Sequence, residues 1–365
     1  MNRTLLNAVR QVHRWTGLTI GLLLAFIATT GIALVFRPQL EPVFERATLQ
    51  VSPCVPRAPL DNVVAAARAA HPGQAIEEIE IQSAPGATVA VRFEDRVDVF
   101  VHPCTTAVIE ARSHWAGFFG TVEQLHRFRF LDNSTGDVIG GAAAIVMVVV
   151  FVAGGSVLWW SVSRRAPKSA FKMDWRLKGR AFELKLHRTA GIYACVVLLI
   201  LGLSSLPLAF KPVRYWIYSA LGSPLPAPKP KSVTPKPGTP PIALETLLRH
   251  SQSLVPEAAQ TVLAPAQVQG APVQVFLIAA DAPHPNARSY AYFDATTGAL
   301  LRFEPYAASS SGNKAHRWLS SLHMGYLGGT LGRLLLLLGV LAVPVLAYTG
   351  IRSFLRPRVR RPAWY

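Results

Sequence analysis

Three cysteines are too few in this sequence to supply the thiolate-rich metal and redox centres of proteins. CxxC, CxxCH and four-cysteine patterns are absent, which argues against a cysteine-bound iron–sulfur cluster and a covalently attached c-type haem. Cys195 lies inside an apolar run, whereas Cys54 and Cys104 fall in one polar segment. An oxidising compartment would let those two form a disulfide, and the sequence leaves this open because it does not give their separation.

Nucleotide-binding patterns are missing as well. No GxGxxG follows a strand and opens a helix, and GxxxxGK[ST] does not occur, so neither a Rossmann dinucleotide site nor a P-loop is indicated. The glycines within 325–332 belong to an apolar run, and we interpret them as helix packing.

Charged residues are scarce in four long stretches, which leaves segments able to cross a membrane. Hydrophobic residues make up 51% of the 365 residues, and a hydrocarbon core about 30 Å thick needs about 20 apolar residues in a helix. We predict membrane helices over 16–36, 138–162, 189–210 and 327–351. The first is interpreted as an uncleaved anchor, because its apolar run exceeds a typical signal peptide and no small-residue cleavage site follows directly.

Acidic residues are outnumbered, with 20 Asp and Glu against 37 Lys and Arg. The basic excess lies beside the apolar runs, so we expect membrane lipid and not nucleic acid as the partner. Residues 163–186 hold eight Lys or Arg, and both ends of the chain are also basic. By the positive-inside rule all three segments are cytoplasmic, and the long segments 37–137 and 211–326 lie outside.

Each half of the sequence repeats one order of elements. An outgoing helix leads to an outer domain, and a returning helix follows. Each outer domain has a short amphipathic segment (61–71; 242–253), then alternating apolar runs with a hairpin-like end (97–109; 290–303). The predicted fold class is an integral membrane protein, mainly α, with four transmembrane helices in two parallel repeats and two small α+β domains.

The predicted boundaries complete this scheme. A proline-rich stretch within 212–241 is expected to be an extended polyproline spacer, because proline excludes helix. The predicted segments are a first membrane helix (1–37), a first outer domain (38–125), a second membrane helix (126–163), a basic cytoplasmic loop (164–186), a third membrane helix (187–211), the spacer (212–241), a second outer domain (242–315), a fourth membrane helix (316–352) and a basic cytoplasmic tail (353–365).

Four of the ten histidines recur at matching places in the two halves. His13 and His187 open the outgoing helices in the shared pattern HRxxG, and His126 and His323 each follow a leucine just before a returning helix. Each membrane face thus receives one histidine from each half. Haem iron takes one axial ligand on each side of the ring, and two imidazoles fill that shell, which favours electron transfer. The pattern predicts a haem held between helices of different halves.

Small and basic residues accompany these histidines. Gly17 and Gly191 lie one helical turn after the two HRxxG histidines and would leave room for a porphyrin edge, with helix–helix packing as the alternative. Arg14, Arg188 and Arg127 each follow a proposed ligand directly and could pair with haem propionates. For the first two arginines, orientation of the chain in the membrane is an equal alternative.

Two other histidines need separate treatment. His316 lies seven residues before His323, on a similar helix face, and competes with it as the fourth ligand. We prefer His323, because its Leu-His pair and the glycines after it are typical of a ligand that enters a helix. His114 could contribute to a pocket at the outer face, with local packing as the alternative.

The ordered motifs resemble the PepSY-associated transmembrane family, whose bacterial inner-membrane members include periplasm-facing ferric-siderophore reductases of the FoxB type. The resemblance covers nearly the whole chain and rests on HRWTG at His13, LHRF at Leu125, LHRTAG at Leu186, LHMGYLGG at Leu322, and the Thr-Gly-Ile steps at Thr30 and Thr349. It implies two b-type haems, an inner one between His13 and His187 and an outer one between His126 and His323. It also implies PepSY-like periplasmic domains.

The activity implied by the resemblance is one-electron reduction of siderophore iron(III), which releases iron because oxygen ligands hold iron(II) more weakly. The implied partners are a periplasmic ferric siderophore and a cytoplasmic or quinol electron donor. The long proline spacer and His316 depart from the family pattern, and His316 puts the fourth ligand in doubt.

Two alternatives belong to other classes. The chain could be a PepSY-type anchor that restrains a periplasmic peptidase, with interfacial histidines and no redox role. A transporter built on the repeat is less favoured, because Arg333 is the only charge well inside the second half's returning helix and 138–162 holds none. The identity of the siderophore stays open.

Overall fold

A computed structural model describes residues 2–164, 166–233 and 242–355. Residues 234–241 of the predicted spacer and 356–365 of the predicted tail lie outside the described residues. The chain divides into two compact units. The helical unit comprises Met1–Phe36, Val122–Arg214 and Leu322–Tyr365, and the sheet unit comprises Arg37–Thr121 and Tyr215–Ser321.

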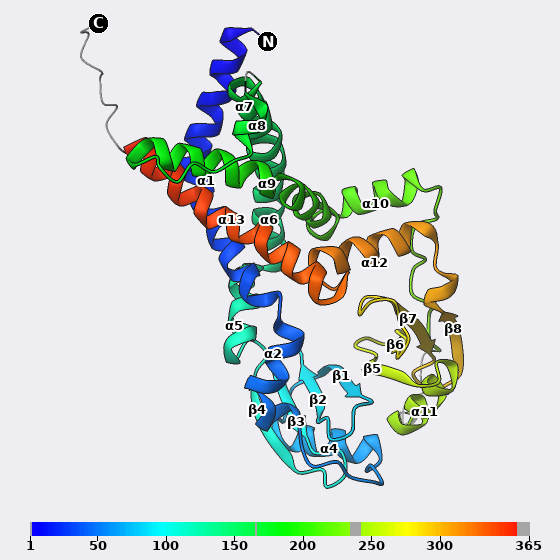
Figure 1. Cartoon of the computed structure of the whole chain (residues 1–365). Helices are drawn as coiled ribbons and strands as arrows, with labels where there is room; N and C mark the ends of the chain where they lie inside the picture. The colour runs from blue at the N-terminus through cyan, green and yellow to red at the C-terminus, as the bar shows by residue number, and fades with distance from the viewer. Residues whose placement is uncertain (1, 165, 234–241, 356–365) are drawn as a thin grey trace, which may run out of the picture. The chain divides into compact units, whose positions relative to one another are not determined.

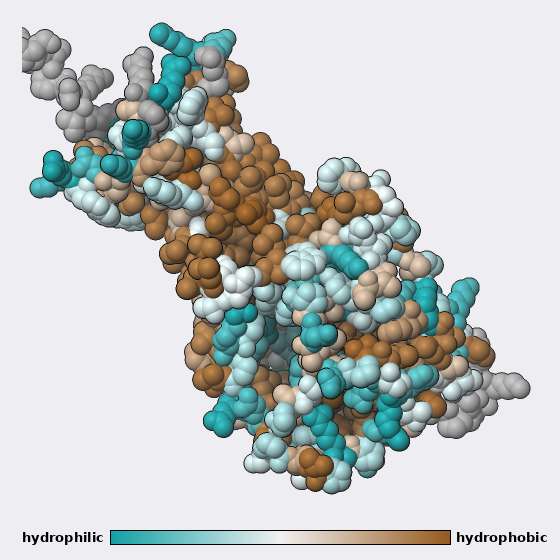
Figure 2. All heavy atoms as spheres, turned by 45° about the vertical axis from the view of Figure 1, so that its right-hand side comes forward, coloured by the Kyte–Doolittle hydropathy of each residue, from teal (hydrophilic) through white to brown (hydrophobic). Residues whose placement is uncertain are grey.

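Four helices in the helical unit are long and apolar enough to cross a membrane, as the apolar runs predict. They are α1 (Arg3–Leu34), a helix over Asn133–Ser163, α9 (Gly179–Ala209) and α13 (Gly329–Leu355) (Figure 1). Figure 2 shows apolar side chains over much of the surface of these helices. Their exposed leucines, valines and phenylalanines suit a lipid environment, because a surface this apolar is unfavourable in water.

The helix over Asn133–Ser163 is not uniform. It consists of α6 (Asn133–Val146), a π-helical turn (Met147–Ala153) and α7 (Gly154–Ser163). Asp132 caps its start, since the side-chain oxygen accepts a hydrogen bond from the Thr135 amide at 2.9 Å. A π-helical turn of this kind often marks a functional position in a helix.

Close approach between the membrane helices depends on glycine. A Cβ atom at Gly202 of α9 would lie 2.5 Å from a Val148 methyl group in the π-helical turn. A Cβ atom at Gly339 of α13 would lie 2.4 Å from a Val197 methyl group in α9. Small residues at these contacts let the helices approach closely, which is how membrane helices associate without a hydrophobic driving force.

The sheet unit contains one continuous antiparallel sheet of eight strands, in the order β4-β3-β2-β1-β5-β6-β7-β8 (Figure 1). The strands are β1 (Ile76–Gln82), β2 (Val89–Phe93), β3 (Val97–Val101), β4 (Val108–Ser113), β5 (Ala258–Ala264), β6 (Val273–Ala279), β7 (Arg288–Phe293) and β8 (Leu300–Glu304). The two halves of the sequence join where β1 pairs with β5, in a register that sets Ile79 opposite Leu263.

This sheet corrects the predicted fold class. A mainly α protein built as helical membrane repeats with two small outer α+β domains is wrong, because β1–β4 and β5–β8 form a single eight-stranded sheet. The strand alternation in each half was correctly recognised. The hydrogen bonds between β1 and β5 join residues about 180 positions apart, and they merge the two expected domains into one core.

Two amphipathic helices cover one face of the sheet, α4 (Leu60–Ala70) and α11 (Leu244–Leu254). They cap each other: Asp61 accepts hydrogen bonds from the amides of Leu244 and Glu245 at 2.9 and 3.0 Å, and Glu245 accepts one from the Leu60 amide at 3.0 Å. A carboxylate at each helix start satisfies amides that have no partner within the helix. The fully buried core beneath them includes Ile79, Val91, Phe93, Leu247, Leu263, Leu277 and Phe293.

Shorter helices complete the described chain. They are α2 (Arg37–Phe44), α3 (Arg46–Leu49), α5 (Gly117–His126), α8 (Pro167–Ala170), α10 (Lys211–Ala220), α12 (Ser311–His323) and a 3₁₀ turn (Tyr306–Ala308).

Two features outside the regular elements fix the sheet unit further. Cys54 and Cys104 form a disulfide, the pairing that the sequence left open. Residues 223–233 of the predicted spacer form neither helix nor strand. Ser232 and Val233 hold this segment in place by donating hydrogen bonds of 2.8 and 2.6 Å to one carboxylate oxygen of Asp294.

Candidate functional site

His13 of α1 and His187 of α9 lie next to each other in the helical unit. Their ring centroids are 6.2 Å apart, and the ring planes are nearly perpendicular at 88°. A metal bonded to one nitrogen of each ring at about 2 Å would set the ring centres about 6 Å apart. The two predicted inner ligands are thus close enough to share one metal ion.

All four predicted histidines use the same ring nitrogen to contact a neighbouring helix. In each case Nδ1 lies within hydrogen-bonding distance of a backbone carbonyl oxygen inside a membrane helix. These pairs are His13 with Val150 (3.2 Å), His126 with Ile27 (3.0 Å), His187 with Leu346 (3.1 Å) and His323 with Leu201 (3.3 Å).

This contact decides which nitrogen is available to a ligand. A carbonyl oxygen accepts hydrogen bonds and cannot donate them, so Nδ1 carries the proton and donates. In a neutral imidazole the other nitrogen, Nε2, then presents a lone pair. An imidazole oriented by a hydrogen bond from one nitrogen, with the other nitrogen free to coordinate, is the usual arrangement of a metal-binding histidine.

A hydroxyl group reinforces the contact at three of the four histidines. The hydroxyl oxygens of Thr30, Thr349 and Ser204 lie 3.1, 3.1 and 3.3 Å from Nδ1 of His126, His187 and His323. Each hydroxyl comes three residues after the accepting carbonyl and donates its own proton to a carbonyl of its helix. His13 has Ala153 at the equivalent place, and its carbonyl partner belongs to the π-helical turn.

Glycines of the facing helices leave room for three of the imidazoles. A Cβ atom added at Gly31 would lie 3.2 Å from Cε1 of His126, and at Gly350 3.5 Å from Cε1 of His187. Gly155 stands in the same relation to His13, also at 3.5 Å. Each Thr-Gly-Ile step thus places a threonine hydroxyl and a glycine without a side chain beside one imidazole. The step at Thr30 serves His126, and the step at Thr349 serves His187.

A cavity of about 670 Å³ contains the inner pair. His13, His187, Gly17 and Gly191 all line it, so the structure brings these four predicted residues together. Its volume falls within the range of about 300–1,000 Å³ that cofactor pockets occupy. Phe151 also lines the cavity and packs edge-on against His13, with ring centroids 5.4 Å apart.

Arginines surround part of this cavity. Arg14 and Arg188, the proposed partners of haem propionates, line it together with Arg10 and Arg180. The Arg14 guanidinium lies 4.3 Å from the centre of the Phe354 ring, which fixes its position by a cation–π contact. The cavity therefore combines two imidazoles and an apolar wall with a cationic margin.

The second predicted pair also belongs to the helical unit. His126 ends α5, and His323 ends α12. Arg127, predicted to pair with a propionate, forms an ion pair with Glu123 at 2.6 Å in the structure.

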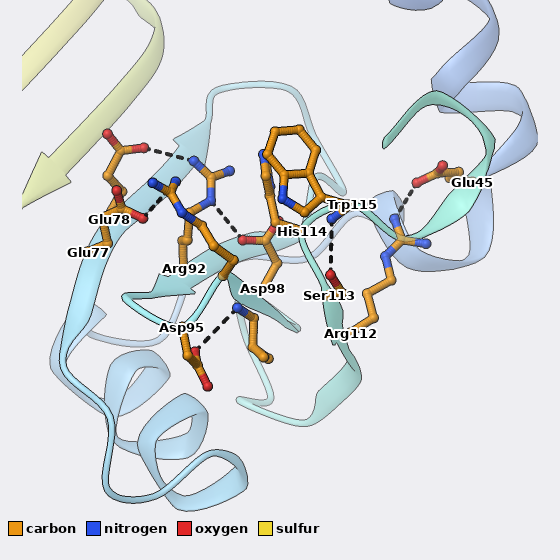
Figure 3. Close-up of polar contacts among 12 residues, drawn as sticks. Glu45, Glu77, Glu78, Arg92, Asp95, Asp98, Arg112, Ser113, His114 and Trp115 are labelled. Carbon is orange, nitrogen blue, oxygen red and sulfur yellow. Dashed lines mark hydrogen bonds and ion pairs between the residues drawn. The ribbon is translucent and has the colours of Figure 1, made fainter. Parts of the chain in front are cut away.

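The remaining histidine candidates lie in the sheet unit. His316 is buried within α12. His114 donates from Nδ1 to Asp98 at 2.8 Å, and Asp98 also accepts from Nε of Arg92 at 2.9 Å (Figure 3). Burial opposes the charge of Asp98, but the His114 hydrogen bond and the charge of Arg92 outweigh it and lower the pKa of the carboxyl. His114 is therefore part of an ionic chain on the sheet.

Cys54, His102 and Cys104 form a cluster with the spacing of a metal site, since their candidate ligand atoms lie within 4.8 Å of one another. The disulfide already joins the two sulfur atoms. Nδ1 of His102 accepts hydrogen bonds from the amides of Cys104 and Thr105, so its Nε2 carries the proton. The geometry of this cluster does not suit a metal.

The hydroxyls and glycines that face the histidines are the site residues to which sequence reasoning assigned no role. The repeated Thr-Gly-Ile steps contained the signal for Thr30, Gly31, Thr349 and Gly350. Ser204 and Gly155 have no such repeat.

No curated protein matches the chain. The model of the family described as the PepSY-associated TM region matches residues 10–356, which is nearly the whole chain and includes all four histidines. The chain is therefore a membrane protein that belongs to the PepSY-associated TM region family.

Proposed function

We propose that this protein is a transmembrane electron carrier with two b-type haems, which reduces siderophore-bound iron(III) at the periplasmic face of a bacterial inner membrane. The inner haem would be held by His13 and His187, and the outer one by His126 and His323. Both termini would be cytoplasmic, because the basic segments flank the helices on that side.

The observation that carries this proposal is the shared orientation of the four imidazoles. Each donates from Nδ1 to a carbonyl of a neighbouring membrane helix, which leaves Nε2 for coordination. If the four histidines were only interfacial, nothing would require all of them to donate from Nδ1 to a backbone carbonyl. His323 shares this geometry, which supports it over His316 as the fourth ligand.

The inner cavity fits a porphyrin in shape and charge. Gly17 and Gly191 line it without side chains that would fill it, and its walls are largely apolar. Arg10, Arg14 and Arg188 place positive charge at its margin, where propionates would otherwise be unpaired near the membrane.

A haem held by these imidazoles would supply one-electron transfer. The protein's own contribution is to hold each imidazole in one tautomer and one orientation. The carbonyls of Val150 and Leu346 do this for the inner pair, and Thr349 adds a second acceptor at His187. Imidazoles that are held in one orientation by hydrogen bonds would move little when a bound iron gained or lost an electron.

The proposed reaction takes one electron from a quinol or a cytoplasmic donor protein and delivers it to chelated iron(III), which leaves as iron(II). Siderophore reduction rests on the resemblance to the FoxB-type reductases, and the histidine geometry supports the electron-carrying part. Release follows because the oxygen ligands of a siderophore bind the divalent ion more weakly.

Stopped-flow spectroscopy tests the activity. The dithionite-reduced protein is mixed with a panel of ferric siderophores in the presence of an iron(II) trap. We expect haem oxidation and one trapped iron(II) per electron with at least one chelate. The gallium(III) form of the same siderophore is the control, because it has nearly the same shape and accepts no electron. If every ferric chelate oxidised the haems no faster than buffer, the reductase proposal would be wrong.

If purified protein took up no haem at all, the peptidase-anchor alternative would become the better account of this family member.

A further inference from the structure

The face of the sheet opposite α4 and α11 carries arginines stacked on aromatic rings. Strand alternation places Phe276 of β6 and Tyr290 of β7 side by side on this face, as cross-strand partners. The Arg288 guanidinium lies 4.5 Å from the centre of the Phe276 ring, and the Arg302 guanidinium lies 4.8 Å from that of Tyr292. Stacking of this kind holds a guanidinium flat and rigid while its edge stays available for hydrogen bonds.

A cavity of about 580 Å³ opens on this face within the sheet unit. Phe276, Arg288 and Tyr290 form one side of it, and Lys229 of the proline-rich segment also lines it. The other side is acidic, with Glu77 and Glu78 of β1 and Glu94 directly after β2. In the sheet, β5 and β6 lie between β1 and β7. The acidic residues therefore line one side of the cavity, and the basic and aromatic residues line the other.

Arg288 and Arg302 differ in their partners. The Nε atom of Arg288 is buried and has no hydrogen-bond partner in the part of the chain that the structure describes. Nε of Arg302 also lacks a hydrogen bond but lies 2.8 Å from a carboxylate oxygen of Glu304, whereas Arg288 forms no ion pair within the residues that the structure describes. A buried donor without an acceptor is unfavourable, because it has lost its hydrogen bonds to water and gained none in the protein. A planar guanidinium with free donors matches a carboxylate, which can accept two parallel hydrogen bonds from it.

The acidic side is largely neutralised by its own arginines. Glu78 pairs with Arg92 at 3.1 Å (Figure 3), and Glu77 pairs with Arg96 at 3.2 Å. Glu94 and Lys229 form no ion pair within residues 2–164, 166–233 and 242–355. The charges left to meet a ligand are therefore two cations, Arg288 and Lys229, and one carboxylate acceptor, Glu94.

We propose that this cavity binds a small organic acid with two or more carboxylates and a hydroxyl group, either free or as its iron(III) chelate. One carboxylate would accept hydrogen bonds from Arg288, a second would pair with Lys229, and the hydroxyl would donate to Glu94. Phe276 would support the ligand through the stacked guanidinium. The site is independent of the proposed haems, because all its residues belong to the sheet unit.

Isothermal titration calorimetry on the full chain in detergent tests this site, with citrate and iron(III) citrate as probes. We expect saturable binding to wild-type protein and at least tenfold weaker binding to Arg288→Gln. Arg302→Gln is the matched control: Arg302 also stacks on a ring, but it already pairs with Glu304 at 2.8 Å and donates to the Pro228 carbonyl at 3.0 Å. Its removal should leave binding unchanged.

Lys229→Gln provides a second variant outside the strands, and it should weaken binding several-fold without affecting folding. Equal binding of both probes supports a site for the free acid, and binding of iron(III) citrate alone supports a site for the chelate. Wild-type affinity in Arg288→Gln, equal losses in the two arginine variants, or no saturable binding of either probe would overturn the proposal. None of these outcomes depends on haem.

Discussion

The hydroxyl oxygen of Thr30 lies 3.1 Å from Nδ1 of His126, which joins α1 to the end of α5. Thr349 and His187 repeat this relationship at the same distance, between α13 and α9. Each threonine is followed by a glycine that faces the same imidazole. A Thr-Gly pair thus orients one histidine at each proposed haem.

Removing these hydroxyls should weaken haem binding without abolishing it. In Thr30→Val and Thr349→Val the carbonyl acceptors of Ile27 and Leu346 remain, so each imidazole keeps one hydrogen bond. Loss of a group that orients a metal-binding histidine costs about 10–100-fold in affinity. Haem-transfer measurements on each variant should show a loss at one haem only. Unchanged retention of both haems would mean that the hydroxyls have no orienting role.

The two glycines should respond differently to alanine. A Cβ atom at Gly31 would lie 3.2 Å from the His126 ring, whereas one at Gly350 would make an ordinary contact at 3.5 Å from His187. Gly31→Ala should therefore displace its imidazole and reduce occupancy of the outer haem. Gly350→Ala serves as the matched control, and electron paramagnetic resonance can compare their low-spin signals. Equal effects of the two substitutions would contradict the packing argument.

His323 and His316 can be separated by substitution. His323→Ala should remove the outer haem, because it deletes the imidazole whose Nδ1 contacts Leu201 and Ser204 of α9. His316→Ala should keep both haems. The reduced-minus-oxidised optical spectrum checks this through the height of the α band. Loss of the outer haem in His316→Ala with retention in His323→Ala would reverse the assignment.

Asp98 should make the sheet unit sensitive to acid. Its pKa is lowered in the folded state, so its stabilising effect is present above the ordinary carboxyl pKa of about 3.9 and is lost as the pH falls below it. Asp98→Asn should cost about 1–3 kcal/mol in unfolding free energy at pH 7. The difference from wild type should narrow at pH 3, because the Asp98 carboxyl of the unfolded chain then binds a proton while that of the folded chain still resists protonation.

Urea unfolding at the two pH values measures this effect. Asp95→Asn is the control, because Asp95 pairs with His71 at a more exposed position and should contribute little. An Asp98→Asn deficit of the same size at both pH values would show that the carboxylate charge is not what stabilises the fold.

The sequence predicts the membrane helices well because length and hydropathy alone define them. The structure extends α1 back to Arg3 and α9 back to Gly179, since polar residues continue these helices beyond the apolar core. The hairpin-like end predicted over 290–303 is also confirmed, and it consists of β7 and β8. These features depend on contacts between residues close in sequence.

The single sheet was missed because strand alternation shows which face a side chain occupies and not which strand lies beside it. Nothing in the pattern around Ile79 specifies Leu263 as its neighbour. Similarly, the carbonyls that accept from the histidines have no side-chain signature. The threonines could be noticed through their repeat, whereas Val150 depends on a π-helical turn that the sequence does not reveal.

Haem quantification by the pyridine haemochrome method tests the central claim most directly. The account predicts two b-type haems per chain in purified wild-type protein, one in His187→Ala and one in His323→Ala. A protein without haem, or two haems retained in both variants, would contradict it.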